Sequence, residues 1–446
     1  QTNIIAKLNQ DLHNSQLVLI NNIKNFIKKS EDKGIPTYGS GTFYFAPFGD
    51  SRGFGKIISN QNILKGLIIN LKIFFKDIYK IAFLGRFKIV SNPDLKKYKN
   101  IIVNWATKKS FDKHGSYYDK HLNTYSDKNK NILWFLILID KNIPKKIGKN
   151  IVLIANEKKK FNIKYLLNTI KASLKAKNLS NLLNDLSYLS LLAKFIYLNF
   201  DKFLSKKTNK ILMPYEGQPF QNAIFKKAHQ INKKIKTIGF LHSFPIGLPL
   251  NLIKRDGAPK KIIVSSISQS YCLRNFLGWK KKEIKILAST RLRVSSNIHM
   301  NNKIFLPITF NSQKKILDNL NNFILNSDIN LANVQIRNHP SCLQSRKHLS
   351  LIKKIKKLLK GTGNKKIKKK ISIFIGATGS VMEALERNVE TIHICENPTL
   401  ESYSKKLWKF IKIKKINDYV NKYNTYKKNQ LIIFGKNVSL YKKYLQ

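Results

Sequence analysis

Two stretches near the C-terminus decide the fold class: Asn333-Val-Gln-Ile-Arg-Asn-His339-Pro340 and Ile371-Ser-Ile-Phe-Ile-Gly-Ala-Thr-Gly-Ser-Val-Met-Glu-Ala-Leu-Glu386. Each is an apolar run typical of a β-strand, and each leads directly into residues able to contact a phosphorylated ligand. In open α/β sheets, ligands bind at the carboxyl ends of the strands. Two such strand ends in succession therefore predict an α/β fold with a nucleotide-sugar site.

The first strand ends in a histidine followed by a proline. Pro340 disfavours the helical conformation at His339, so His339 is expected to be extended at the strand tip. Its imidazole is then free to donate a hydrogen bond to an anion.

The second stretch passes from a strand to a helix that is expected to begin near Val381. The N–H groups and the dipole at a helix N-terminus attract phosphate, and Gly379 lets a ligand approach the backbone closely. The hydroxyls of Thr378 and Ser380 lie beside that glycine in sequence. A second interpretation stays open, because Ser380 and Glu383 have the spacing of a capping box that needs no ligand.

Strand and helix patterns alternate along most of the chain, which predicts two Rossmann-like domains in series. A polar break at residues 295–302 predicts a hinge, with one domain at 1–295, including a helical insertion, and the other at 296–446, including a closing C-terminal segment; a cleft is expected between them. Strands are predicted at 81–90, 100–105, 131–138, 150–155, 210–213, 236–240, 261–264, 283–287, 303–307 and 391–395. Helices are predicted at 4–29, within 163–203, from 219, from 268, and at 316–325 and 400–411.

Charge is the most extreme property of the composition. The formal net charge is +59, and lysine, isoleucine and asparagine are abundant throughout the 446 residues, which A/T-rich codons would produce. A nucleic-acid-binding protein concentrates its basic residues on one face. The lysine runs at 353–360 and 365–370 are therefore interpreted as a solvated helix face and a loop. A chain this basic is also expected to be drawn to anionic lipid surfaces.

The cysteines favour a reducing cytoplasm, because Cys272, Cys342 and Cys395 are isolated and cannot form a disulfide framework. The longest apolar run, at 132–139, is far short of a membrane span. The chain begins with Gln1, which leaves open whether its N-terminus is complete.

Several motifs are absent from the sequence, including Gly-x-Gly-x-x-Gly, the Walker A lysine, Gly-x-Ser-x-Gly and His-Glu-x-x-His. No Asp-x-Asp occurs either, which argues against a transferase that holds a diphosphate through Mg²⁺. We therefore predict no metal and no cofactor, with phosphate neutralised by hydrogen-bond donors and dipoles.

These residues resemble the GT-B-fold glycosyltransferases. The His-Pro pair, the turn with Thr and Ser, and Glu383-Ala-Leu look like the CMP-sugar site of capsule Kdo transferases and polysialyltransferases. The chain is also similar, over roughly 81–411, to a group of bacterial surface-carbohydrate biosynthesis proteins. That similarity rests on three segments, Tyr215-Glu-Gly-Gln-Pro-Phe220, Lys236-Thr-Ile-Gly-Phe-Leu-His-Ser243 and Asn131-Ile-Leu-Trp-Phe-Leu-Ile-Leu-Ile139.

The resemblance implies a nucleotide sugar, with CMP as a candidate nucleotide, bound as a substrate by the C-terminal domain. His339, before Pro340, would contact the phosphate, Thr378 and Ser380 the phosphate or base, and Glu383 the ribose. The capsule enzymes tend to carry Ser-Thr or Ser-Ser at this turn, whereas this chain places Gly379 between its two hydroxyls.

The resemblance also implies a catalytic base in the N-terminal acceptor domain, within reach of an acceptor hydroxyl. Glu216 and His242 both follow short apolar strands, and Asp119 is a third candidate. Two structural interpretations stay open: Glu216 as a helix N-terminal carboxylate ahead of Pro219, and His242 as a hydrogen-bonded residue at a strand end.

The function predicted from the sequence is transfer of a sugar to a glycan or glycolipid of capsule or lipopolysaccharide, at the inner face of the cytoplasmic membrane. Two other functions stay open. A sugar-nucleotide epimerase of the same architecture would act on the nucleotide sugar itself, and a basic nucleic-acid-binding protein would need only the charge.

Overall fold

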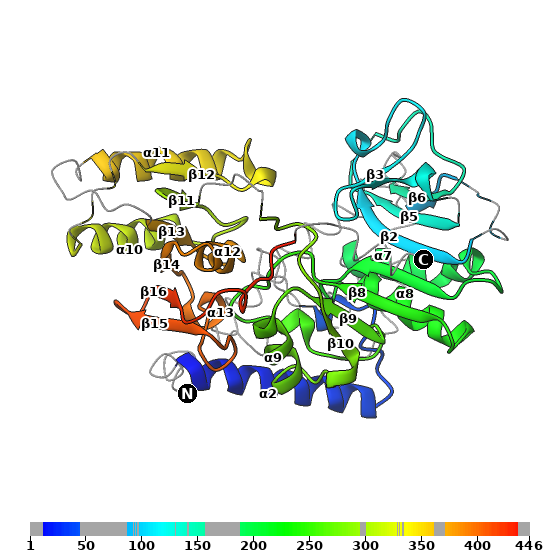
Figure 1. Ribbon diagram of the computed structural model, residues 1–446, viewed down its shortest axis with the longest axis horizontal. Helices are drawn as coiled ribbons and strands as arrows, with labels where there is room; N and C mark the ends of the chain where they lie inside the picture. Colours follow the sequence, from blue (N-terminus) through cyan, green and yellow to red (C-terminus); the bar gives the residue numbers. More distant parts are fainter. Residues whose placement is uncertain are drawn as a thin grey trace, which may run out of the picture.

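The computed structural model describes residues 12–44, 87–91, 93, 95, 98–129, 131–140, 142–156, 188–294, 300–327, 329, 331, 334–360 and 371–435. Its strands form two large sheets, each with helices packed beside it, and a small hairpin of two strands (Figure 1). Among the described residues, no helix combines the length and the apolar character that a membrane span requires.

The first sheet has the strand order β1-β6-β5-β2-β7-β8-β9-β10. All of its neighbouring strands run parallel except β1, which pairs antiparallel with β6. From β6 to β9 this is the 3-2-1-4-5-6 order of a Rossmann fold. Its strands are β1 (Phe87–Ile89), β2 (Asn100–Ala106), β5 (Ile132–Leu138), β6 (Ile151–Asn156), β7 (Lys210–Pro214), β8 (Lys236–Phe240), β9 (Lys261–Val264) and β10 (Ile284–Ile286). The hairpin β3 (Tyr118–Asp119) and β4 (Thr124–Tyr125) follows β2.

The core of this domain follows from strands that are covered on both faces. All seven residues of β5 are buried, as expected for a parallel strand whose sequence is a continuous apolar run. Leu133, Phe135 and Ile137 contribute to the hydrophobic cluster on one face, and Trp134 and Leu136 to the cluster on the other. The helices of this domain are α2 (Leu12–Asp32), α7 (Tyr188–Asn199), α8 (Pro219–Ile231) and α9 (Ile267–Asn275).

The second sheet has the order β12-β11-β13-β14-β16-β15. The first four strands are parallel, and β16 and β15 continue the sheet antiparallel. The strands are β11 (Lys303–Phe305), β12 (Gln335–Arg337), β13 (Ile371–Ile375), β14 (Glu390–Ile394), β15 (Ile411–Lys415) and β16 (Val420–Thr425). The helices are α10 (Gln313–Leu325), α11 (Arg346–Lys360), α12 (Ser380–Glu386) and α13 (Pro398–Glu401).

Short 3-10 turns connect several of these elements. They are η1 (Gly41–Phe43), η3 (Lys108–Ser110), η4 (Ser126–Lys128), η5 (Phe200–Phe203), η6 (Leu250–Leu252), η7 (Lys281–Glu283) and η8 (Pro340–Cys342).

The predicted fold class, α/β with two Rossmann-like domains that face a cleft, is confirmed. Each strand predicted from 100 onward overlaps a strand of the structure. The helices predicted at 4–29 and within 163–203 correspond to α2 and to α7 with η5, although residues 1–11 and 157–187 lie outside the described part. Residues 295–299 of the predicted break at 295–302 also lie outside the described residues, and the limits of the two domains stay a prediction.

The helix predicted at 400–411 is wrong. Only α13 is helical there, and the hairpin of β15 and β16 that follows was not predicted. The spacing of apolar residues predicted a helix here, but two of the aromatic side chains contact the other domain instead. The Tyr403 hydroxyl donates to the Pro245 carbonyl at 2.9 Å, and the Trp408 indole N–H donates to the Gly247 carbonyl at 2.7 Å.

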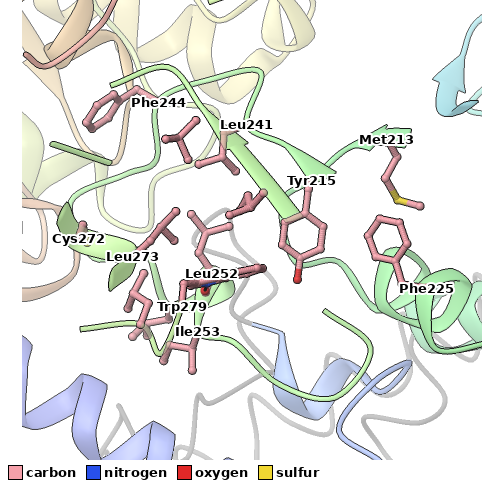
Figure 2. Packing of buried hydrophobic residues seen from close by; sticks show 14 of the residues in the cluster. Met213, Tyr215, Phe225, Leu241, Phe244, Leu252, Ile253, Cys272, Leu273 and Trp279 are labelled. Carbon is pink, nitrogen blue, oxygen red and sulfur yellow. Dashed lines mark hydrogen bonds between the residues drawn. The ribbon is translucent and has the colours of Figure 1, made fainter. Parts of the chain in front are cut away.

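The same two aromatic side chains belong to a hydrophobic cluster that continues into the first domain. Leu241, Phe244, Leu273 and Trp279 belong to that cluster (Figure 2), and the Phe244 ring lies 4.9 Å from the ring of Trp408. One core therefore extends through both domains.

Two chain segments also bridge the domains. Helix α2 runs along the lower edge of the molecule (Figure 1); the Gln16 amide donates to Thr399 and Ser402 at 2.9 and 2.7 Å, and the Glu31 carboxylate accepts from the N–H of Asp256. The segment 429–435 returns to the first domain, where Ile433 donates to Ser265 at 2.7 Å.

His393, on β14, makes stability depend on pH. Its ring is fully buried, with Nε2 2.7 Å from the Gly376 carbonyl and Nδ1 3.2 Å from the Tyr423 hydroxyl. Burial lowers the pKa of His393 from 6.5 to about 4. The unfolded chain then binds a proton that the folded protein does not, so stability is lost as the pH falls from about 6.5 to about 4.

We predict that His393→Gln weakens this pH dependence, because glutamine keeps hydrogen-bonding groups but does not titrate. Across this window the wild type should lose roughly 3 kcal/mol more unfolding free energy than the variant. Denaturant unfolding at pH 7 and at pH 4 measures the difference. Equal losses in the two proteins would remove His393 as the cause.

Candidate functional site

A cavity of about 350 Å³ lies between the two sheets. In the second sheet the strand order reverses between β11 and β13, and ligands of open α/β sheets bind at such a reversal. Residues 306–308 after β11 and 377–380 after β13 line the cavity. From the first domain, residues 215–216 after β7 and 241–246 after β8 line the opposite wall.

Glu216 and His242 form a pair on the wall from the first domain. His242 Nε2 lies 3.3 Å from Glu216 Oε1, and the Gln218 amide donates to Glu216 Oε2 at 2.9 Å. The ends of β7 and β8, which the sequence predicted separately, thus bring these two side chains into contact. His242 Nδ1 is covered and has no hydrogen-bond partner among the described residues.

Burial shifts the titration of both groups. The Glu216 side chain is 41% exposed, but this surface faces the cavity rather than bulk solvent. Desolvation therefore raises the pKa of the Glu216 carboxyl, although the Gln218 hydrogen bond and the charge of Arg291 act to lower it. Burial and Arg291 lower the pKa of His242 to about 4. At neutral pH His242 is therefore a neutral ring that donates through Nε2 to Glu216.

Glu216 does not cap helix α8. The cap is Gln218, whose partner Gln221 accepts from the N–H groups of Glu216 and Gln218 at 2.9 and 3.0 Å. The chain turns from β7 into this cap at Gly217, which has a φ of +69°. A side chain does not fit at this position, because a Cβ would lie 2.0 Å from the carbonyl oxygen of Asn251. The Glu216 carboxylate is thereby left facing the cavity.

His339 lies on the opposite wall, from the second domain. Its backbone is extended, with φ −65° and ψ 137°, as predicted from Pro340. The N–H of Ser341 donates to Nδ1 at 3.3 Å, which leaves Nε2–H as the donor of the neutral ring. Burial and the charge of Arg291 lower the pKa of His339. Pro340 itself is exposed, begins η8 and is not part of the cavity wall.

The turn of Thr378, Gly379 and Ser380 lines the cavity, but Gly379 serves a different purpose from the predicted one. A Cβ there would lie 2.2 Å from the carbonyl oxygen of Phe244. Gly379 therefore allows the backbone of the first domain, rather than a ligand, to approach closely. The Thr378 hydroxyl accepts from the N–H of Ser380 at 3.2 Å, and α12 has only seven residues, which limits what its dipole can contribute.

The capping-box interpretation of Ser380 and Glu383 is wrong. The N-cap is Gly379, with no side-chain cap, and the Glu383 carboxylate instead pairs with Arg387 one turn later, at 3.1 Å. Glu383 is almost buried and still lines the cavity.

Arg291 was not identified from the sequence. It lies between β10 and β11, lines the cavity, and acts electrostatically on Glu216, His242 and His339. Its guanidinium makes no hydrogen bond or ion pair with any residue that the structure describes. One arginine in an irregular segment of a chain with 83 lysines and arginines carries no local pattern that would single it out.

Asp119, the third candidate for a base, has a structural role. It is 1% exposed, and its carboxylate accepts from Asn104 Nδ2 at 2.8 Å and from the N–H groups of His121 and Leu122 at 2.7 and 2.9 Å. His121, which this turn positions, packs edge-on against His242 with ring centroids 4.8 Å apart.

Within the described part of the chain, no group of three or more His, Cys, Asp or Glu side chains is arranged to hold a metal ion. The three cysteines are buried free thiols.

Comparison with known proteins adds little. No protein-family model matches the chain, and no curated protein matches it significantly. Among solved structures, alpha,alpha-trehalose 6-phosphate synthase from Burkholderia multivorans aligns with 62% of this chain and 76% of its own, at 10% identity and a TM-score of 0.33. A likeness this weak says nothing about what this protein does.

Proposed function

We propose that this protein is a metal-independent glycosyltransferase of bacterial surface-polysaccharide synthesis, of capsule or lipopolysaccharide. It would transfer a sugar from a nucleotide-sugar donor, with a CMP-sugar as first candidate, to a glycan or glycolipid acceptor. One observation carries the proposal: a single cavity between two Rossmann-like domains holds hydrogen-bond donors for an anion on one wall and a desolvated carboxylate on the other.

The wall from the second domain suits the donor. His339 Nε2–H on this wall is expected to bind the donor phosphate, together with the unpaired guanidinium of Arg291, which lines the cavity from the segment between β10 and β11. Hydrogen bonds to an ionised phosphate are strong. In this proposal Thr378 and Ser380 contact the phosphate or base. Glu383 contacts the ribose through Oε2, the oxygen that Arg387 leaves unbound.

The wall from the first domain suits the chemical step. Glu216 would take the proton from the acceptor hydroxyl as its oxygen attacks the anomeric carbon. The bond between that carbon and the phosphate oxygen breaks, and the negative charge left on the phosphate is stabilised by His339 and Arg291. His242 would orient the Glu216 carboxylate through its Nε2 contact. A raised pKa suits Glu216 for this role, because proton transfer is most efficient when the pKa of the base lies near the working pH.

The donor wall is tested by nucleotide binding. We predict that CMP, UMP, UDP, GDP or CDP raises the melting temperature, and that His339→Ala and Arg291→Ala each weaken the best nucleotide by roughly 1.5–3 kcal/mol. Arg274→Ala is the matched control, because Arg274 is exposed on α9 and lies away from the cavity. Folded variants with unchanged affinity would remove these two residues from the donor site.

The base is tested by kinetics in buffer that contains EDTA. Glu216→Gln should bind donor nucleotide normally and lose on the order of 10²–10⁴ in turnover, whereas His242→Ala should raise the acceptor KM more than it lowers kcat. Because burial raises the pKa of Glu216, the wild-type rate should fall, as pH is lowered, at a higher pH than an ordinary glutamate would give. Near-normal turnover of Glu216→Gln means that the base is misassigned, and strict dependence on added Mg²⁺ contradicts a metal-free reaction. Product formed without any acceptor would favour an epimerase.

Location at the membrane surface belongs to the same proposal and is supported by helix α11. Its exposed face carries lysines at 353, 354, 356, 357 and 360. Each basic residue near an anionic bilayer contributes about 1 kcal/mol. The double change Lys353→Glu and Lys357→Glu should therefore weaken binding to vesicles that contain anionic lipid by roughly 2 kcal/mol or more. The same change at Lys28 and Lys29, exposed on α2, should have less effect. Equal effects in a sedimentation assay would mean that net charge alone is responsible.

A further inference from the structure

A second cavity, of about 240 Å³, lies in the first domain. The strand order of the first sheet reverses between β2 and β7, which is where a Rossmann-like sheet places its ligand. Residues 104, 105 and 107 at the end of β2 and residues 214 and 216 at the end of β7 line this cavity, together with residues 117, 118, 120 and 121 in and next to β3. The cavity therefore occupies the ligand position of the first sheet, as the larger cavity occupies that of the second.

The two cavities share one wall. Glu216 and His242 line both of them. A carboxylate in this position faces the proposed donor on one side and the contents of the second cavity on the other. A general base has to lie within hydrogen-bond reach of the proton that it removes, and a molecule in the second cavity meets that requirement.

The lining of the second cavity has a definite chemistry. Trp105 and Tyr118 are half-buried aromatic residues, and the indole N–H of Trp105 has no partner among the described residues. Hydroxyls come from Thr107, Ser110 and the two tyrosines at 117 and 118.

The charged groups of this lining are few. Lys120 and Glu216 are the two charged residues among those that line it. A sugar ring matches such a lining, because its C–H face packs on an aromatic ring while its hydroxyls bind polar groups. A volume below the range of about 300–1,000 Å³ typical of larger ligands indicates one ring rather than a nucleotide.

We propose that this second cavity is the acceptor subsite and that it binds the terminal sugar ring of the acceptor against Trp105 and Tyr118. The acceptor role rests on the proposed function, whereas sugar binding does not. The hydroxyl that receives the transferred sugar then faces Glu216, and the acceptor enters from the side of the hairpin, opposite the donor.

Tryptophan fluorescence tests the subsite directly. The chain has four tryptophans, and Trp134, Trp279 and Trp408 are at most 2% exposed, so Trp105 is the one whose emission a ligand in this cavity changes. The probes are the methyl glycosides of glucose, galactose, mannose and N-acetylglucosamine, titrated without nucleotide. At least one should change the emission saturably, and Trp105→Phe should abolish the change.

Two comparisons then locate the probe. Tyr118→Ala should weaken the best glycoside at least tenfold, whereas Tyr426→Ala, a change of an exposed tyrosine on the other domain, should leave it unchanged. A saturating nucleotide should not compete with the glycoside in the wild-type protein, a measurement that does not depend on any variant folding. Competition, no response to any of the four probes, or normal binding by folded Tyr118→Ala would each overturn the proposal.

The outcomes also separate this inference from the proposed function. Nucleotides that stabilise the protein without any glycoside binding would overturn the acceptor subsite and leave the donor site supported. Glycoside binding without any nucleotide effect would overturn the transferase, and with it the acceptor role, while supporting a sugar-binding cavity.

Discussion

The contact between the two domains is the constraint on which the rest of the structure depends. The Tyr403 hydroxyl oxygen lies 2.9 Å from the Pro245 carbonyl of the first domain and 2.8 Å from the Thr378 carbonyl of the second, so its one proton is shared between the two domains. Beside it, the backbone of Phe244 packs so closely on Gly379 that no side chain fits between them. These contacts hold the loops after β8 and β13 against each other, and the walls of the larger cavity are built from those loops.

The strand order of each sheet then determines which residues line the cavity. Each sheet reverses its order once, between β2 and β7 in the first sheet and between β11 and β13 in the second. Because the domains meet at the carboxyl ends of their strands, the two reversals lie on either side of Glu216 and His242. Neither domain alone provides both the wall that carries His339 and the Glu216 carboxylate. The proposed chemistry is therefore a property of the assembled pair of domains.

The sequence identified the cavity residues that directly follow strands. It did not identify features that depend on contacts between the two domains. Glu216, His242 and His339 each follow a short apolar run, which is a local signal, and all three line the cavity. Arg291 lies in an irregular segment and offers no such signal. The role of Gly379 and the loss of the helix at 400–411 both arise from contacts between residues more than a hundred positions apart, which patterns of neighbouring residues do not record.

The bridges made by α2 and by the segment 429–435 limit how the domains can move. Gln16 and Glu31 tie the two ends of one helix to different domains, and Ile433 adds a third connection. Wide opening would break all of them together with the shared core, so the cleft is largely formed before any ligand arrives. Binding then costs little conformational entropy, and exchange of ligands must proceed through the mouths of the cavities rather than by swinging the domains apart.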